Sequence, residues 1–144
     1  MPKIEKITKQ TENPYVNLYL VEGKNKADHP FRYYVASRAK TMEALKIKTK
    51  KNTPDGVLMY SLYGEKRDKI VLVRQYRVSI DDYIYEFPAG LVESGEEFHE
   101  AAVREMHEET GLTFHPLKVD PCYEKPFFTT IGMTDEACSA VYGW

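Results

Sequence analysis

Short runs rich in β-branched and aromatic residues recur along the first 90 residues of the chain and predict strands. Residues with turn-forming side chains separate these runs, as in "TPDG" at 53–56, which predicts a joint between two parts of the chain. The sequence "GEKRDK" at 64–69 predicts the loop of a hairpin. The predicted strands are 15–21, 31–36, 57–63, 70–76 and 83–87.

One helix is predicted after these strands, over residues 96–110. This segment carries strong helix formers, and Gly111 stands where a helix commonly ends. Phe98, Ala102 and Met106 would share one face and pack on a sheet. Further strands are expected at 117–125 and 136–144, on either side of a loop at 126–136. Strands, one helix and then more strands indicate an α+β sandwich rather than a doubly wound sheet.

Composition excludes several classes of protein. A chain of 144 residues with a formal net charge of −2 does not suggest a nucleic-acid-binding protein. No apolar stretch approaches membrane-spanning length, and the charged start "MPKIEKITKQ" predicts no signal peptide. Cys122 and Cys138 lack metal-ligand spacing and predict reduced thiols in a cytoplasm.

The predicted helix concentrates negative charge on one face. Glu105, Glu108 and Glu109 stand at i, i+3 and i+4, and Ala101 leaves the face open one turn earlier. Two like charges about 5 Å apart, at an effective dielectric of about 20, repel by roughly 3 kcal/mol. A hard divalent cation such as Mg²⁺ would neutralise them, and the preceding loop "PAGLVESG" could add a main-chain carbonyl. The alternative is an ordinary solvated acidic face.

The spacing of the whole segment from Gly90 to Leu112 favours the metal site. It matches G-x5-E-x7-R-E-U-x-E-E-x-G-U, where U is apolar, and so resembles the box of the Nudix hydrolases. That resemblance implies an α/β/α sandwich of mixed β-sheets. It also implies metal-dependent hydrolysis of a nucleoside diphosphate linked to another group.

The resemblance also assigns roles to individual residues. Glu105, Glu108 and Glu109 would be the catalytic Mg²⁺ or Mn²⁺ ligands, and the main-chain carbonyl of Ala89 would be an additional ligand. Glu96 and Arg104 would pair and hold the motif together, and Gly90 and Gly111 complete it. His99 and His107 are interpreted as surface residues of the helix.

The segments "IVLVRQYR" and "YEFPAGLVESGE" resemble the ADP-ribose pyrophosphatase branch of this family. Arg77 would then contact the substrate diphosphate or terminal ribose, with Arg74 a weaker candidate. "YVASR" at 34–38 adds Arg38 as a nucleotide-binding candidate. The branch implies a homodimer in which a small N-terminal β element, residues 1–52, completes the substrate pocket. Its tyrosines could stack on a base or fill the core: Tyr15, Tyr19, Tyr33 and Tyr34.

Other positions leave the substrate and the general base open. Pro126 and the turn "IGMTDE" at 131–136, where Ile131 replaces a proline, are two incompatible alignments of the branch's substrate marker. The catalytic domain, 53–144, is expected to be incomplete at its C-terminus, so the general base could lie beyond Trp144. Glu136 is the nearest candidate within the chain. The alternatives are a hydrolase of another dinucleotide or nucleoside triphosphate, and a nucleotide-binding domain without useful turnover.

Overall fold

The computed structural model describes all of residues 1–144, which divide into two compact units. The first unit comprises Met1–Asn52 and Phe128–Glu136, and the second comprises Thr53–Phe127 and Ala137–Trp144. The segment 128–136, which the sequence predicts to belong to the catalytic domain, packs instead with the first unit. The elements are β1 (Lys3–Lys9), β2 (Asn17–Lys24), β3 (Pro30–Ser37), α1 (Lys46–Thr49), β4 (Gly56–Tyr63), β5 (Lys69–Ile70), β6 (Val73–Arg77), β7 (Asp82–Glu86), β8 (Ala89–Leu91), α2 (Phe98–Thr110), the 3-10 helix η1 (Pro121–Tyr123), β9 (Phe127–Phe128) and β10 (Ala137–Gly143).

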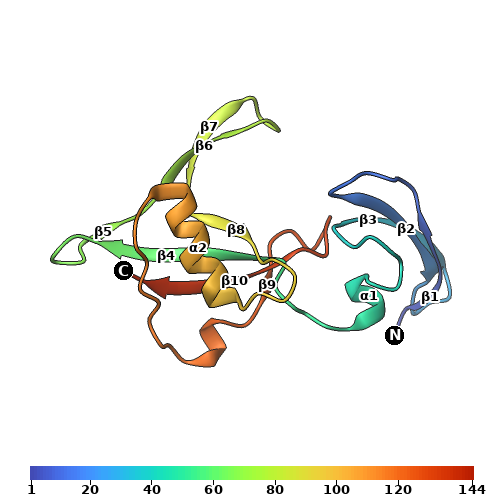
Figure 1. The fold of residues 1–144 in the computed structure, drawn as a ribbon. Helices are drawn as coiled ribbons and strands as arrows, with labels where there is room; N and C mark the ends of the chain where they lie inside the picture. The colour runs from blue at the N-terminus through green and yellow to red at the C-terminus, as the bar shows by residue number, and fades with distance from the viewer. The chain divides into compact units, whose positions relative to one another are not determined.

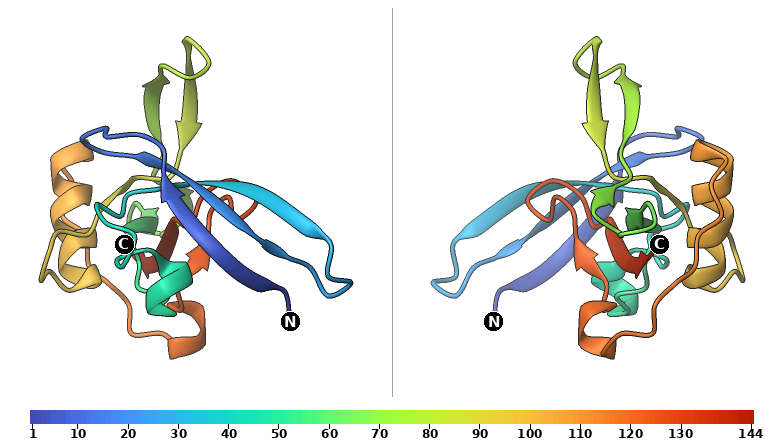
Figure 2. Two further views of the ribbon diagram at one scale, coloured as in Figure 1. Left: turned by 90° about the vertical axis from the view of Figure 1, so that its right-hand side faces the viewer. Right: turned by 90° about the vertical axis from the view of Figure 1, so that its left-hand side faces the viewer.

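The first unit is built on an antiparallel sheet of order β1-β2-β3 (Figure 2). Strand β1 was not predicted, because Ile4 and Ile7 are its only large apolar residues and the rest of "KIEKITK" is polar, as suits an exposed edge strand. The segment 128–136 returns to the other edge of this sheet. There the Ala36 N–H donates to the carbonyl of Met133 at 2.9 Å.

The sheet of the second unit has the order β5-β4-β10-β9, with β8 paired antiparallel to β4. Strands β4 and β10 run parallel, in a register that places Gly56 opposite Cys138. Asp55 fixes the start of β4, because its carboxylate accepts from the Ala137 N–H at 2.9 Å and its carbonyl from the Val92 N–H at 3.1 Å. This sheet is the platform on which α2 lies.

Helix α2 packs on β4, β8 and β10 and forms the core of the second unit (Figure 1). Its own Ala101, Ala102 and Met106 are fully buried, as are Val57 and Met59 of β4. Burying a side chain the size of Met106 stabilises the fold by about 1.5–3 kcal/mol. The predicted helix and its apolar face are thus confirmed, but Ala101, expected to leave the acidic face open, lies fully buried in the core.

Local sequence explains both ends of α2. The carboxylate of Glu97 caps the start by accepting from the His99 N–H at 2.8 Å. Gly111 ends the helix with φ at 72°, in the left-handed region, and its N–H bonds the His107 carbonyl at 2.8 Å. The predicted C-cap is confirmed, and the helix begins at Phe98, two residues later than expected.

The predicted hairpin around 64–69 is confirmed, but the strand expected at 70–76 is divided. Ile70 pairs with Leu62 of β4, whereas the chain from Val73 onward leaves this sheet and pairs with β7 instead. The β6–β7 hairpin projects from the rest of its unit (Figures 1 and 2). It carries Arg74 and Arg77.

The strand expected at 117–125 is wrong. Most of this segment is irregular, and Pro121 begins the short helix η1. The Asp120 carboxylate caps it by accepting from the Cys122 N–H at 2.9 Å. Proline suits the first helical position because it has no N–H to satisfy there, so the Asp-Pro pair outweighs the apolar pattern around it.

Candidate active site

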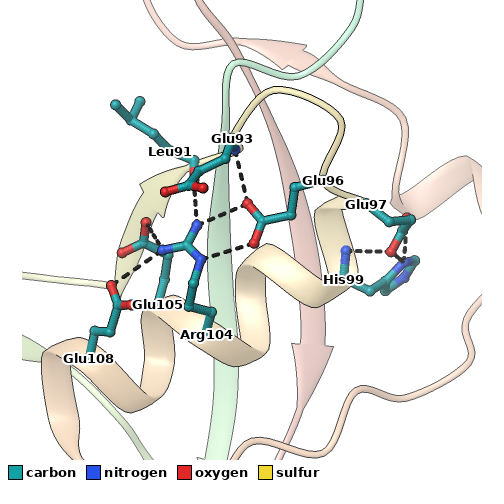
Figure 3. Close-up of polar contacts among 8 residues, drawn as sticks. All are labelled: Leu91, Glu93, Glu96, Glu97, His99, Arg104, Glu105 and Glu108. Atoms are coloured by element: carbon teal, nitrogen blue, oxygen red, sulfur yellow. Dashed lines mark hydrogen bonds and ion pairs between the residues drawn. The ribbon is translucent and has the colours of Figure 1, made fainter.

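The centre of the box is the guanidinium of Arg104, which reaches four other residues (Figure 3). Its Nε and Nη2 donate to the two carboxylate oxygens of Glu96, each at 2.9 Å. Its Nη1 donates to Glu105 at 2.9 Å and to Glu108 at 3.2 Å, and Nη2 also donates to the carbonyl of Leu91 at 3.0 Å. The expected pairing of Glu96 and Arg104 is therefore present, and it fastens the loop before α2 to the second half of the helix.

This ion pair shifts the protonation of both partners. Hydrogen bonds from Arg104, and then from the Glu93 N–H, lower the pKa of Glu96 to about 2. The same bonds to Glu96, with those to Glu105, raise the pKa of Arg104 further above its usual range. Glu96 and Arg104 are thus both charged throughout the physiological pH range.

Gly90 is required by the position of Glu105. A Cβ added at Gly90 would overlap the carboxylate of Glu105, which lies directly against this part of β8. The Glu105 side chain is only 15% exposed. The motif glycine therefore lets a charged helix side chain rest on bare strand backbone.

Glu109 is held to the same strand. Its Oε2 accepts from the Ala89 N–H at 3.1 Å. The pKa of Glu109 is raised, chiefly by burial and then by the charges of Glu105 and Glu86. The hydrogen bond from Ala89 and the charge of Arg77 lower this pKa, but by less. Negative charge thus gathers beside β8, where a cation would be stabilised.

Glu86 is a further member of this cluster, and no sequence pattern singles it out. Its Oε1 lies 2.7 Å from Nη2 of Arg77, so the two side chains form an ion pair. The angles of this contact do not make it a hydrogen bond, and the buried Oε1 has no other hydrogen-bond partner. In the sequence, only its position in the segment "YEFPAG" at 85–90 associates Glu86 with the site. Arg77 is thus brought near Glu109, whereas Arg74 stacks its guanidinium on Tyr83, 4.1 Å from the ring centroid.

The three proposed metal ligands are not gathered around one point. Glu105 and Glu108 are directed at Arg104, Glu109 is directed at Ala89, and no three His, Cys, Asp or Glu side chains are arranged to hold an ion. The donors nevertheless fit a hard divalent cation. They are all oxygens, Gly90 leaves space for the carboxylate of Glu105, and the Ala89 N–H holds Glu109 against the same strand.

The N-terminal candidates lie in the first unit. Arg38 pairs with Glu136 at 2.8 Å, so two residues named separately from the sequence bind each other, and Thr129 also donates to Glu136 at 3.4 Å. Tyr19 is a core residue, fully buried with its hydroxyl donating to the Ala39 carbonyl at 2.7 Å. The hydroxyl of Tyr33 donates to the carbonyl of Gly132. Tyr15 and Tyr34 are exposed.

A family model described as the NUDIX domain matches residues 52–142. The chain belongs to the Nudix family. The resemblance found in the sequence is thus confirmed. A crystal structure of ADP compounds hydrolase, 19% identical, covers 99% of this chain and 66% of its own with a TM-score of 0.73, which confirms the α+β Nudix fold.

Curated relatives of this Nudix chain carry names that agree with the expected branch. The ADP-ribose pyrophosphatase of Saccharomyces cerevisiae is 35% identical over 80 residues, 54% of this chain and 35% of that protein. The ADP-sugar pyrophosphatase of Mus musculus is 36% identical over 87 residues, which are 58% of this chain and 40% of that protein. The ADP-ribose pyrophosphatase of Bacillus subtilis (strain 168) is 44% identical over 61 residues, which are 42% of this chain and 33% of that protein. The matches cover 33–40% of these relatives.

No helix of the chain is both long and apolar enough to cross a membrane.

Proposed function

We propose that this Nudix chain hydrolyses the diphosphate bond of ADP-ribose or a related nucleoside diphosphate sugar, with Mg²⁺ or Mn²⁺ as cofactor. The products would be a nucleoside monophosphate and a sugar phosphate. The observation that carries the proposal is the gathering of Glu105 and Glu109 on the bare backbone of β8, with Arg77 nearby. The names of the relatives support the choice of substrate.

In this proposal the box carboxylates hold the metal. Glu105, Glu108 and Glu109 supply oxygen ligands together with the carbonyl of Ala89, and Glu108, whose side chain is 58% exposed, can turn from Arg104 without disturbing the core. A bound divalent ion would lower the pKa of a coordinated water and stabilise charge on the leaving phosphate oxygen. Arg104 keeps its two bonds to Glu96 and continues to orient the helix.

Arg77 is the residue proposed to bind the substrate diphosphate. Its planar guanidinium can donate two parallel hydrogen bonds to phosphate oxygens. Glu86 holds it at 2.7 Å beside the carboxylate cluster, which orients the side chain before substrate arrives. Arg38 is proposed for the nucleotide, and Arg74 remains a weaker candidate because its guanidinium lies on Tyr83.

The experiment is a Mg²⁺-dependent hydrolysis screen of ADP-ribose, nucleotide sugars, NADH and dinucleotide polyphosphates. Glu108→Gln removes one ligand charge, and Glu100→Gln, an exposed residue on the first turn of the same helix, is the matched control. Preferential cleavage of ADP-ribose or an ADP-sugar, lost in Glu108→Gln and kept in Glu100→Gln, supports the proposal. If the chain cleaves a dinucleotide or a nucleoside triphosphate preferentially, that compound replaces ADP-ribose as the proposed substrate. Nucleotide binding without turnover would favour a binding domain, which the engagement of two box carboxylates by Arg104 also favours.

A homodimer is proposed as the assembly, on the branch resemblance. Light scattering on the purified chain measures its mass directly, and a monomeric mass at enzyme-assay concentration would exclude it.

A further inference from the structure

His99, on the first turn of α2, meets a carboxylate with each of its two ring nitrogens. Nδ1 lies 3.1 Å from both carboxylate oxygens of Glu97. Figure 3 shows the two side chains in contact at the start of the helix. Nε2 lies 2.8 Å from Oε1 of Glu124, in the segment that follows η1. The sequence predicts a surface position for His99, but its side chain is 34% exposed and that of Glu124 only 17%.

The chemistry of these contacts decides the protonation state that satisfies them. An ionised carboxylate only accepts hydrogen bonds, and a neutral imidazole has one N–H and one lone pair. In the neutral form one ring nitrogen would therefore present a lone pair to a negative oxygen. Only the imidazolium ion, which donates from both nitrogens, makes both contacts favourable.

Both glutamates make a further hydrogen bond, Glu97 through its carboxylate and Glu124 through its main-chain carbonyl. Glu97 caps α2, with its Oε2 accepting from the His99 N–H at 2.8 Å. The carbonyl of Glu124 accepts from the hydroxyl of Ser139 on β10 at 2.9 Å, and Ser139 is 1% exposed. Phe98, which packs against the core, lies beside the imidazole with ring centroids 4.1 Å apart.

We propose that Glu97, His99 and Glu124 form a proton-controlled clasp, which ties the segment between α2 and β10 to the start of α2. The clasp is closed when His99 carries both ring protons, and it opens between His99 and Glu124 when one proton is lost. Glu96, which binds Arg104, stands directly before the capping residue. The clasp therefore stabilises the end of the helix from which the box network begins.

The electrostatics agree with this geometry. Burial lowers the pKa of His99, but the hydrogen bonds to Glu124 and Glu97, and the charges of the same two carboxylates, raise it more, so that the net pKa is above 6.5. For a group whose pKa is raised by folding, the added stability is fully present below the unfolded-state value. It is lost as pH rises through the higher folded-state value. The clasp thus weakens from pH 6.5 upward.

The test is an NMR titration of the imidazole Cε1–H signals in the whole chain, with His99 assigned from its loss in His99→Gln. We expect a midpoint above 6.5, and a lower midpoint in Glu124→Gln, which keeps the burial of the ring and loses the second carboxylate. A midpoint at or below 6.5 in the unaltered chain would overturn the proposal without any variant. So would a midpoint that Glu124→Gln leaves in place.

Thermal unfolding measured from pH 6 to pH 9 gives a second readout. We expect His99→Gln to lower the melting temperature most at pH 6, with the difference shrinking toward pH 9. The control is His107→Gln, which removes an exposed histidine from the other end of the same helix. An equal loss at all pH values would reduce His99 to a packing residue and reject the clasp. None of these measurements needs substrate or metal, so the result is independent of the proposed hydrolysis.

Discussion

Arg104 holds Glu96 with two hydrogen bonds of 2.9 Å, and its third nitrogen reaches the carboxylates of Glu105 and Glu108. One guanidinium thus links a residue with a structural role to two proposed metal ligands. Because a cation and Arg104 attract the same oxygens, metal binding should loosen the bonds to Glu105 and Glu108 while the pair with Glu96 stays.

Replacing Glu96 should remove part of the acid sensitivity of the fold. Folding lowers the pKa of Glu96 from 4.5 to about 2, so its stabilising effect is present above 4.5 and is lost as pH falls toward 2. Glu96→Gln should therefore unfold at a lower temperature than the unaltered chain at pH 7. The two melting temperatures should converge as the pH is lowered below 4.5. Calorimetry across this range is the measurement, and a constant gap would contradict the prediction.

Gly90→Ala should displace Glu105. The new methyl group would overlap its carboxylate, and overpacking of this kind typically destabilises by about 1–3 kcal/mol. We expect a lower melting temperature and a larger proportional loss of hydrolysis, because Glu105 is a proposed ligand. Gly132→Ala is the control, since a Cβ there meets nothing within 4 Å and its backbone is not left-handed. Hydrolysis at the original rate in Gly90→Ala would show that Glu105 does not need its present position.

The helix and its box were predictable because their signals are local. Gly111 ends α2 by its backbone freedom, and the apolar face containing Met106 follows from helical periodicity alone. The reason for Gly90 was not predictable, because it depends on a carboxylate 15 residues away in the chain. The ion pair of Arg77 with Glu86 joins residues that do not stand opposite each other in the β6–β7 register, so no local pattern specifies it.

Arg77→Gln should lower kcat/KM for the preferred substrate by about 10- to 100-fold, the effect of losing a charged hydrogen bond of about 1.5–3 kcal/mol. The kcat/KM of Arg77→Lys should lie between those of the unaltered chain and Arg77→Gln, because lysine keeps the charge but lacks the planar guanidinium. Arg67→Gln, whose guanidinium lies 3.8 Å from the centroid of the Trp144 ring, controls for the loss of an arginine from the same unit. Steady-state kinetics separate these cases, and equal effects of Arg77→Gln and Arg67→Gln would contradict the assignment.

Mg²⁺ should stabilise the folded chain, and a chelator should reverse the effect. At a free ion concentration of about 100 times Kd, the gain in the free energy of unfolding is about 2.7 kcal/mol. Glu109→Gln should abolish most of this gain, because it removes a negative charge from the cluster beside β8. Glu100→Gln should retain it. Melting curves with and without Mg²⁺ measure the effect, and an equal response of both variants would place the ion elsewhere.

The segment expected as a strand at 117–125 shows a different limit of sequence reasoning. Leu117 and Val119 alternate with polar residues as in a strand, but Asp120 and Pro121 supply a cap and a fixed φ that start a turn of helix instead. Beyond this point, Glu124 finds its partner in His99, 25 residues earlier in the chain. A short-range pattern identifies neither the partner nor the charge that the contact requires.

The return of residues 128–136 to the first unit makes that unit discontinuous in the chain. During synthesis on the ribosome, β1, β2 and β3 are complete long before Met133, whose carbonyl accepts from Ala36, has been added. A fragment ending at Asn52 lacks that edge contact altogether. One edge of the sheet that comes first in the sequence is therefore completed only by a segment that is synthesised after α2.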